Sequence, residues 1–291
     1  MNKSGIIIVD KPKGMSTNKL IQLLKRKMNI KKIGHAGTLD PLATGLVICL
    51  LNNATKLSDY FLNENKNYEF EITLFKSTST YDAEGEIINQ EETREIELQT
   101  LNEVILKFDG LTYDQEPPIF SAIKINGKKL YEYAREGKEV EIKKRRITIN
   151  QLKLLSYDKK NNSIKLQANC SKGTYIRSLA CDIANSLKTI GYVSELRRMQ
   201  SGQFLIEDSK ELDKIDEKDI INIYDSLKLA KLSIVHLNEL VDVNNGKKIK
   251  LDSEDKIVFI SDSHQNVYAC YEKIENDIYK CRRGGLNDAS N

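Results

Sequence analysis

The sequence predicts an α+β protein, in which a mixed β-sheet with helices on its flanks is followed by a small β domain. The first observation is a set of apolar or alternating runs, such as residues 46–51 and 68–74, that are typical of strands. The second is a set of amphipathic helical patterns between those runs. The third is a change after residue 230, where three short strands are separated by polar turns. We therefore expect a large domain over residues 1–230 and a small one over residues 231–291.

The N-terminal part of the chain supplies the first strands and helices. Residues 6–9 suit a buried strand, and residues 46–51 are apolar throughout, as in a strand buried on both faces. Between them, Ser16 can cap a helix with Leu20, Ile21, Leu24 and Met28 on its buried face. The other elements predicted here are a short helix over residues 54–61, an alternating strand over 68–74, and a helix over 98–108 that ends at Gly110.

The middle of the chain is predicted to supply further strands and helices. Residues 115–122 must be extended, because the paired prolines Pro117 and Pro118 exclude a helix. Strands are predicted over residues 139–149, 151–156 and 164–170, and a short helix precedes them. Thr174 can then cap a helix in whose first turn Arg177 lies off the buried stripe. Because the helix macrodipole disfavours a cation there, we expect Arg177 to pair with a carboxylate elsewhere in the fold.

Composition points to a soluble globular protein without a metal site. Of the 291 residues, 40% are hydrophobic and 30% charged. No apolar run approaches membrane-spanning length, and the run at residues 6–9 is too short for a signal peptide, so we expect a cytoplasmic protein. The five cysteines form no Cys-x-x-Cys pair, and the three histidines form no ligand pair. We therefore expect neither a disulfide framework nor a bound transition metal.

Charge is segregated, although the net charge is only +3. Residues 122–146 contain nine basic and four acidic side chains, whereas residues 86–103 contain six acidic side chains and one arginine. One basic face on a nearly neutral chain is typical of a protein that binds a polyanion. An ordinary solvated surface with uneven spacing would give the same counts, and charge alone does not separate the two interpretations.

The stretch over residues 34–45 contains one acidic side chain, Asp40, one histidine, His35, and three glycines. Glycines allow close approach of the backbone to a ligand, and Asp followed by Pro fixes a turn. Local physics favours a capped turn between two core elements. The alternative is a single reactive carboxylate held on a rigid loop.

Several separate motifs within residues 5–204 together resemble the bacterial tRNA pseudouridine-55 synthases of the TruB type. The motifs that carry this resemblance are residues 10–16, 34–45, 66–68, 115–122 with 127–135, 170–177, and 196–204. The C-terminal segment more weakly resembles a truncated PUA domain, a small RNA-binding fold. Phe120, Ser79-Thr80 and Asn52-Asn53 depart from the usual family residues, outside the implied catalytic set.

The resemblance implies a pseudouridine synthase fold with a central active-site cleft and a PUA-like domain over residues 231–291. It implies that Asp40 is the essential carboxylate, that Tyr68 stacks on a flipped-out uridine, and that Arg177 pairs with Asp40 and keeps it ionised. An insertion over about residues 110–150 would grip the RNA. The residues implied to bind substrate are His35, Lys11, Lys56, Leu196, Tyr175, Lys124, Lys128, Lys129 and Arg135.

The implied reaction isomerises uridine 55 in the T loop of tRNA and needs no cofactor. The expected partner is the T arm of tRNA, bound by a monomer. Two alternatives stay open: a non-catalytic RNA-binding or tRNA-folding protein on the same scaffold, and a synthase that acts on another RNA. The sequence also leaves open whether Asp40 attacks the sugar or promotes elimination to a glycal.

Overall fold

The computed structural model describes residues 3–121, 123–138 and 140–287, and for Arg135 the backbone alone. The chain forms two compact units, which we describe separately. The first unit comprises residues 1–41, 45–63 and 200–291, and the second comprises residues 42–44 and 64–199.

The first unit is built on a buried antiparallel pair of strands. β1 (Gly5–Lys11) pairs with β3 (Thr44–Leu51), whose residues from Leu46 onward are all buried, as the apolar run predicted. β2 (Ile33–His35) pairs with β3. β14 (Lys210–Glu211) and β15 (Ile221–Asn222) both pair with β1. The charged segment over residues 208–219 therefore contributes the strand β14 to the sheet.

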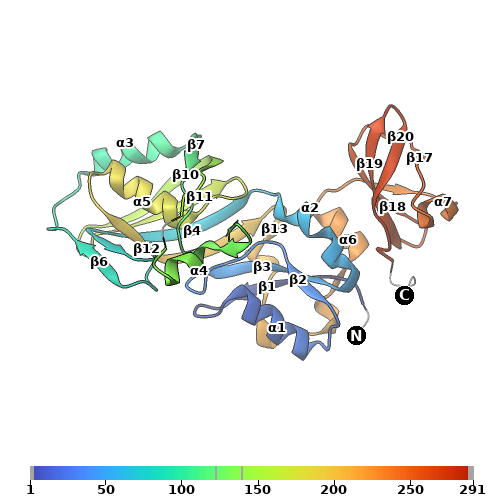
Figure 1. Cartoon of the computed structure of the whole chain (residues 1–291), viewed down its shortest axis with the longest axis horizontal. Coiled ribbons are helices and arrows are strands. Elements are labelled where there is room, and N and C mark those ends of the chain that lie inside the picture. Colours follow the sequence, from blue (N-terminus) through green and yellow to red (C-terminus); the bar gives the residue numbers. More distant parts are fainter. Residues whose placement is uncertain (1–2, 122, 139, 288–291) are drawn as a thin grey trace. The chain divides into compact units, whose positions relative to one another are not determined.

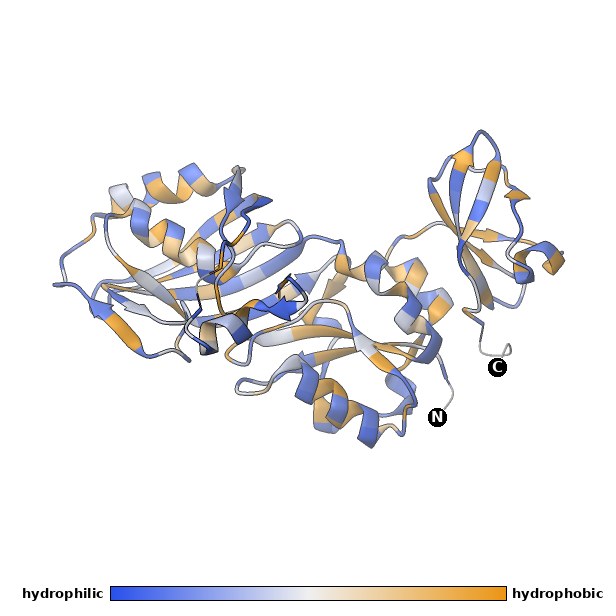
Figure 2. Cartoon of the chain, in the orientation of Figure 1, coloured by the Kyte–Doolittle hydropathy of each residue, from blue (hydrophilic) through white to orange (hydrophobic). Residues whose placement is uncertain are grey.

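Helix α1 (Thr17–Lys27) follows the sequence prediction closely. The side chain of Ser16 accepts a hydrogen bond from the Lys19 backbone N–H, and Leu20, Ile21 and Leu24 are buried. Figure 2 shows both hydrophobic and hydrophilic positions along this helix. The other helices of this unit are η1 (Asn52–Leu57), α2 (Ser58–Leu62), η2 (Ile206–Asp208), η3 (Leu212–Lys214), η4 (Glu217–Asp219), α6 (Ile223–Leu229) and α7 (Val241–Asn244).

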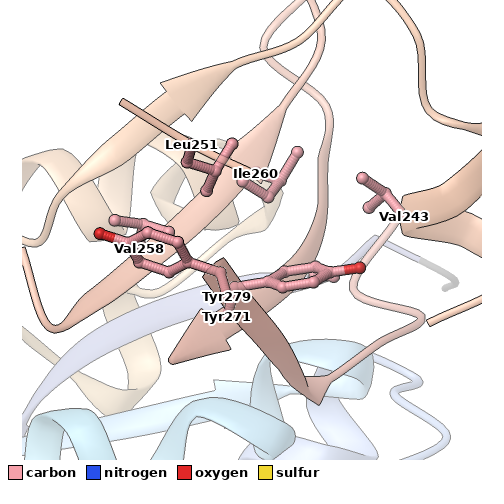
Figure 3. Packing of buried hydrophobic residues seen from close by; sticks show 7 residues of the cluster. Val243, Leu251, Val258, Ile260, Tyr271 and Tyr279 are labelled. Atoms are coloured by element: carbon pink, nitrogen blue, oxygen red, sulfur yellow. The ribbon is translucent and has the colours of Figure 1, made fainter. Parts of the chain in front are cut away.

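The C-terminal lobe has a core of its own. Its five strands lie in the order β16 (Ile234–His236), β18 (Ile257–Ser261), β19 (Val267–Glu275), β20 (Ile278–Arg283) and β17 (Ile249–Lys250). Figure 3 shows the apolar cluster around Tyr271 and Tyr279. Both tyrosine hydroxyls donate to backbone carbonyls, so these buried polar atoms are satisfied. This lobe fits the predicted small β domain, and the boundary at residue 231 stays a prediction.

The second unit is an antiparallel sheet with two helices on one face. The strand order is β12 (Gly191–Ser201), β4 (Lys66–Leu74), β11 (Ser163–Cys170), β10 (Arg145–Asp158) and β7 (Thr112–Gln115). Helices α3 (Leu98–Phe108) and α5 (Ile176–Ser186) lie together over this sheet (Figure 1). Tyr68, Phe70, Ile72 and Leu74 alternate inward along β4, as predicted.

The sequence pattern wrongly divided one strand into two. The sequence predicts strands over residues 139–149 and 151–156, but β10 runs unbroken from Arg145 to Asp158. The pairing with β11 shifts register between Ile149 and Gln151, so an irregularity in one strand produces the apparent gap in the pattern. Residue 139 lies outside the described residues, and residues 140–144 precede the strand.

The remaining short elements are hairpins. β5 (Lys76–Thr78) pairs with β6 (Ile87–Gln90), and β13 (Phe204–Leu205) pairs with the end of β12. Within the predicted insertion, β8 (Lys124–Ile125) pairs with β9 (Lys128–Lys129), and helix α4 (Leu130–Arg135) follows.

Candidate active site

In the first unit, the main chain is held on both sides of Asp40. The hydroxyl of the buried Thr17 donates to the Leu39 carbonyl at 3.0 Å and accepts from the Leu39 N–H at 2.9 Å. On the other side, the Gly14 N–H donates to the Pro41 carbonyl at 2.8 Å. The main chain before and after Asp40 is therefore held in place, which fits both a capped turn and a carboxylate on a rigid loop.

Lys11 contributes to the same loop from inside the protein. Its side chain is fully buried, and its ammonium group donates to the carbonyls of Pro12, Met15 and Pro41. Three carbonyl acceptors satisfy the three donors of a lysine, which is how a buried ammonium is stabilised. This arrangement fits a role in holding the loop, and the predicted contact of Lys11 with substrate stays untested.

Two other predicted residues of the first unit lie on different elements. His35 is half-buried at the end of β2, opposite Cys49 of β3. Lys56 lies in η1 and donates to the carbonyls of Gly284 and Gly285 of the C-terminal lobe. Burial, and then the nearby charge of Lys32, lower the pKa of Lys56 below its ordinary value.

In the second unit, Arg177 is buried and does pair with a distant carboxylate. Its Nε lies 3.6 Å from an oxygen of Asp82, and both side chains are about 95% buried. Its two terminal nitrogens donate to the carbonyls of Thr80 and Phe120, each at 2.9 Å. Buried charges need a partner of opposite charge and hydrogen-bond acceptors, and this guanidinium has both. The expectation of a carboxylate partner for Arg177 is confirmed, with Asp82 in that position.

Sequence reasoning did not identify Asp82. The carboxylate accepts hydrogen bonds from the Thr80 hydroxyl at 2.6 Å and the Glu84 N–H at 3.0 Å. The backbone of residues 81–83 pairs with Val193 of β12, and this pairing carries Asp82 into the interior. The cation at the start of α5 indicated that a partner was needed, but nothing local to Asp82 distinguished it from other acidic residues. Asp40 belongs to the other unit, so its pairing with Arg177 stays a prediction.

The cap of α5 also differs from the prediction. Thr174 does not cap the helix; its hydroxyl donates to the Ser171 carbonyl, and the N-cap residue is Tyr175. No side chain of the helix itself caps it. Instead, the side chain of the buried Gln115 accepts from the Tyr175 N–H at 2.8 Å. A residue sixty positions away therefore satisfies a backbone donor at the start of the helix.

Tyr68 and Leu196 come from neighbouring strands of the same sheet. Tyr68 lies on β4 opposite Ala168 of β11 and is 9% exposed. Leu196 lies on β12, the strand next to β4, and is 8% exposed. An aromatic ring and an aliphatic side chain from adjacent strands can form an apolar support for a base.

The predicted RNA contacts of the insertion lie on its hairpin and helix. Lys124 is exposed on β8, opposite Lys129 of β9. Lys128 forms an ion pair with Glu136 and lies 4.9 Å from the centre of the Tyr133 ring. Lys129 lies 5.3 Å from the centre of the Tyr131 ring. The side chain of Arg135 lies outside the described residues.

Two further observations concern metal ligands and membrane-spanning helices. Among the described residues, no three His, Cys, Asp or Glu side chains gather where they could hold a metal ion. In that same part of the chain, every helix is too short or too polar to cross a membrane.

Solved structures share the fold of this chain. The chain aligns with a TM-score of 0.72 to a chain of a crystal structure of a Cbf5–Nop10–Gar1 complex, at 21% identity, covering 97% of this chain and 85% of the other. An H/ACA ribonucleoprotein bound to a substrate RNA gives a TM-score of 0.70 at 20% identity, covering 96% and 84%. The fold is that of the pseudouridine synthases, as the sequence predicted.

Sequence comparison identifies the family. The profile of the TruB family pseudouridylate synthase, N-terminal domain, matches residues 25–176. A tRNA pseudouridine synthase B of Mesoplasma florum is 56% identical over 99% of this chain and 100% of its own length. One of Bacillus cereus is 37% identical over 92% of each chain. This chain belongs to the TruB family of pseudouridylate synthases.

Proposed function

We propose that this protein isomerises uridine 55 in the T loop of tRNA to pseudouridine, with Asp40 as the essential carboxylate. The observation that carries the proposal is the loop of Asp40, in which Leu39 and Pro41 on either side are held by buried or backbone donors. Family membership and the tRNA pseudouridine synthases among the relatives support the substrate. We expect the enzyme to act as a cytoplasmic monomer on the T arm.

The reaction needs no atom from outside the nucleotide except protons. The bond between C1′ of the ribose and N1 of uracil breaks, the base rotates, and a bond between C1′ and C5 forms. The proton on C5 leaves to solvent and N1 takes one up, so the product is an isomer of the substrate. One carboxylate at the sugar suffices for either route, whether it attacks C1′ or promotes elimination to a glycal.

The other residues have supporting roles in this proposal. Tyr68 stacks on the flipped-out base, and Leu196 closes the apolar side of its site. Arg177 provides positive charge that keeps Asp40 ionised, while Asp82 and two carbonyls fix the direction of its guanidinium. Lys11 holds the loop of Asp40. His35 on β2 and Lys56 on η1, in the same unit, bind the substrate RNA.

The test is Asp40→Asn, assayed by tritium release from tRNA labelled at C5 of uridine. We expect turnover to fall to background while tRNA affinity stays within about threefold, because many basic groups carry affinity and one carboxylate carries the chemistry. Asp59→Asn, which changes an exposed carboxylate of α2, is the matched control and should keep full activity. A tRNA with cytidine at position 55 should release no tritium.

Two results would count against the proposal. Turnover by Asp40→Asn above background would remove Asp40 from the essential position. Tight tRNA binding by the unaltered protein without any pseudouridine formation would instead favour the non-catalytic tRNA-folding alternative.

A further inference from the structure

Residues 115–120, the root of the insertion, hold the start of helix α5. The Gln115 side chain binds both main-chain groups of Tyr175. The Phe120 carbonyl accepts from Arg177 at 2.9 Å. The Glu116 carbonyl accepts from the Ser178 hydroxyl at 2.7 Å. The helix that bears Arg177 therefore begins on the segment from which the insertion departs.

The amide of Gln115 is the centre of this contact. Its oxygen accepts from the Tyr175 N–H at 2.8 Å, and its nitrogen donates to the Tyr175 carbonyl at 3.2 Å. The nitrogen also donates to the Tyr113 hydroxyl at 3.0 Å, and that hydroxyl donates to Asp182 of α5 at 2.7 Å. The side chain of Gln115 is 1% exposed, so both ends of its amide are fixed by protein partners.

This contact matters because the first N–H groups of a helix have no partner within the helix. In α5 the N-cap residue, Tyr175, makes no side-chain cap, and Gln115 supplies the missing acceptor to its N–H. Arg177 is the second residue of the helix. A shift of the helix start would move its guanidinium away from Asp82 and the two carbonyls.

We propose that Gln115 is a positioning residue: it fixes the start of α5 to the root of the insertion, and so makes the placement of Arg177 depend on the segment that receives RNA. This inference rests on the proposed function, because it gives Arg177 a part in that reaction. It adds a residue outside the set that the sequence motifs implied to bind or react with the substrate.

The first test is Gln115→Met, which keeps the length of the side chain and removes its polar atoms. In single turnover at saturating enzyme, the rate constant should fall about tenfold or more, because the unpaired backbone groups let the helix start relax. The dissociation constant for a T-arm RNA should stay within about twofold, since Gln115 is uncharged and buried. Tyr113→Phe, which removes only the hydroxyl that supports the amide, should give a smaller loss in the same direction.

Thr189→Val is the matched control. Thr189 is buried beyond the other end of α5, where its hydroxyl donates to Glu91 at 2.6 Å. This variant also loses one buried hydrogen bond and should lower the melting temperature. If Gln115 served stability alone, both variants would lose melting temperature and both would keep the rate constant of the folded enzyme.

A double-mutant cycle with Arg177→Lys tests whether Gln115 acts through Arg177. Two changes that act through the same guanidinium should be strongly non-additive, so Gln115→Met should cost little rate when Arg177 is already lysine. Full additivity would overturn the proposal, as would an unchanged rate constant in a folded Gln115→Met protein.

Hydrogen exchange separates this inference from the proposed function. Amide exchange over residues 175–178 should accelerate in Gln115→Met and stay unchanged in Thr189→Val, whether or not Asp40 is essential. Unchanged exchange over those residues in both variants would overturn the positioning role even if Asp40→Asn is inactive as expected.

Discussion

At the scale of single residues, the main chain on either side of Asp40 is held by Thr17 and Lys11. Thr17 uses one hydroxyl to satisfy both main-chain groups of Leu39, and the ammonium of Lys11 donates to carbonyls that include that of Pro41. Thr17 and Lys11 lie about twenty or more residues away in sequence from the groups that they hold on either side of Asp40. The position of the main chain that bears Asp40 therefore depends on residues distant in sequence, and the proposed role of Asp40 requires such a fixed position.

This arrangement predicts that Thr17→Val lowers turnover while Thr17→Ser does not. Valine has the shape of threonine but leaves the N–H and carbonyl of Leu39 unpaired, which costs about 1–3 kcal/mol of unfolding free energy. We expect single-turnover rates about tenfold lower for Thr17→Val with nearly unchanged tRNA affinity, because the loop loosens while the phosphate-binding groups stay in place. Urea denaturation and single-turnover kinetics measure both effects. Equal rates for the valine and serine variants would contradict the role of the hydroxyl.

At the scale of elements, the insertion combines basic side chains with internal partners. Lys128 is paired with Glu136, and Lys128 and Lys129 each lie near a tyrosine ring. Exposed ion pairs contribute little free energy, so a phosphate can replace Glu136 readily. We infer that in the free protein these two lysines contact Glu136 and the tyrosine rings, and that RNA phosphates would replace those contacts on binding.

The competing carboxylate makes a specific prediction. Glu136→Gln should tighten T-arm binding by about two- to fivefold, because Lys128 no longer has to leave an ion pair. Lys128→Ala combined with Lys129→Ala should weaken binding. It should also flatten the plot of log affinity against log salt by about one unit for each phosphate that the variant no longer binds. Salt titrations of binding measure both effects.

The control for this pair of experiments is Glu92→Gln, which removes an exposed carboxylate elsewhere in the second unit. It changes net charge by the same amount and should leave affinity almost unchanged. If Glu92→Gln tightened binding as much as Glu136→Gln, the effect would be one of net charge. If the double lysine variant kept the original salt slope, the hairpin would not contact phosphates.

At the scale of the whole molecule, a buried lysine gives stability a pH dependence. Lys66 is 6% exposed at the start of β4, and its ammonium donates to the Glu64 carbonyl. Burial, and then the nearby charge of Arg198, lower the pKa of Lys66 from 10.5 to about 8. The folded state therefore binds fewer protons than the unfolded state between pH 8 and 10.5, so the unfolding free energy should rise with pH across this window.

We expect that rise to amount to at most about 3 kcal/mol, and Lys66→Met should remove it. Lys153→Met, at an exposed position of β10, is the control and should keep the wild-type profile. Urea denaturation at several pH values between about 7 and 10.5 measures the difference between variant and wild type, in which other titrating groups cancel. If the plots of unfolding free energy against pH for Lys66→Met and the wild type were parallel, the pKa of Lys66 would not be lowered in the folded state.

The sequence by itself determined most of the elements and the family. Alternation along β4, the apolar run of β3, and the cap and buried face of α1 are properties of neighbouring residues, and the structure confirms each of them. The motifs around Asp40 and Arg177 also lie within short stretches, so the resemblance to the TruB family could be read from them directly.

The tertiary structure decided which groups hold the candidate site. Arg177 pairs with Asp82, Tyr175 is capped by Gln115 sixty positions away, and Lys11 points inward to carbonyls. Local propensity favoured Thr174 as the cap, and nothing local to Lys11 indicated that its ammonium group donates to the Pro41 carbonyl. Hydrogen bonds are satisfied by partners that the fold brings within about 3 Å and charges by partners within about 4 Å, and sequence distance does not limit that choice.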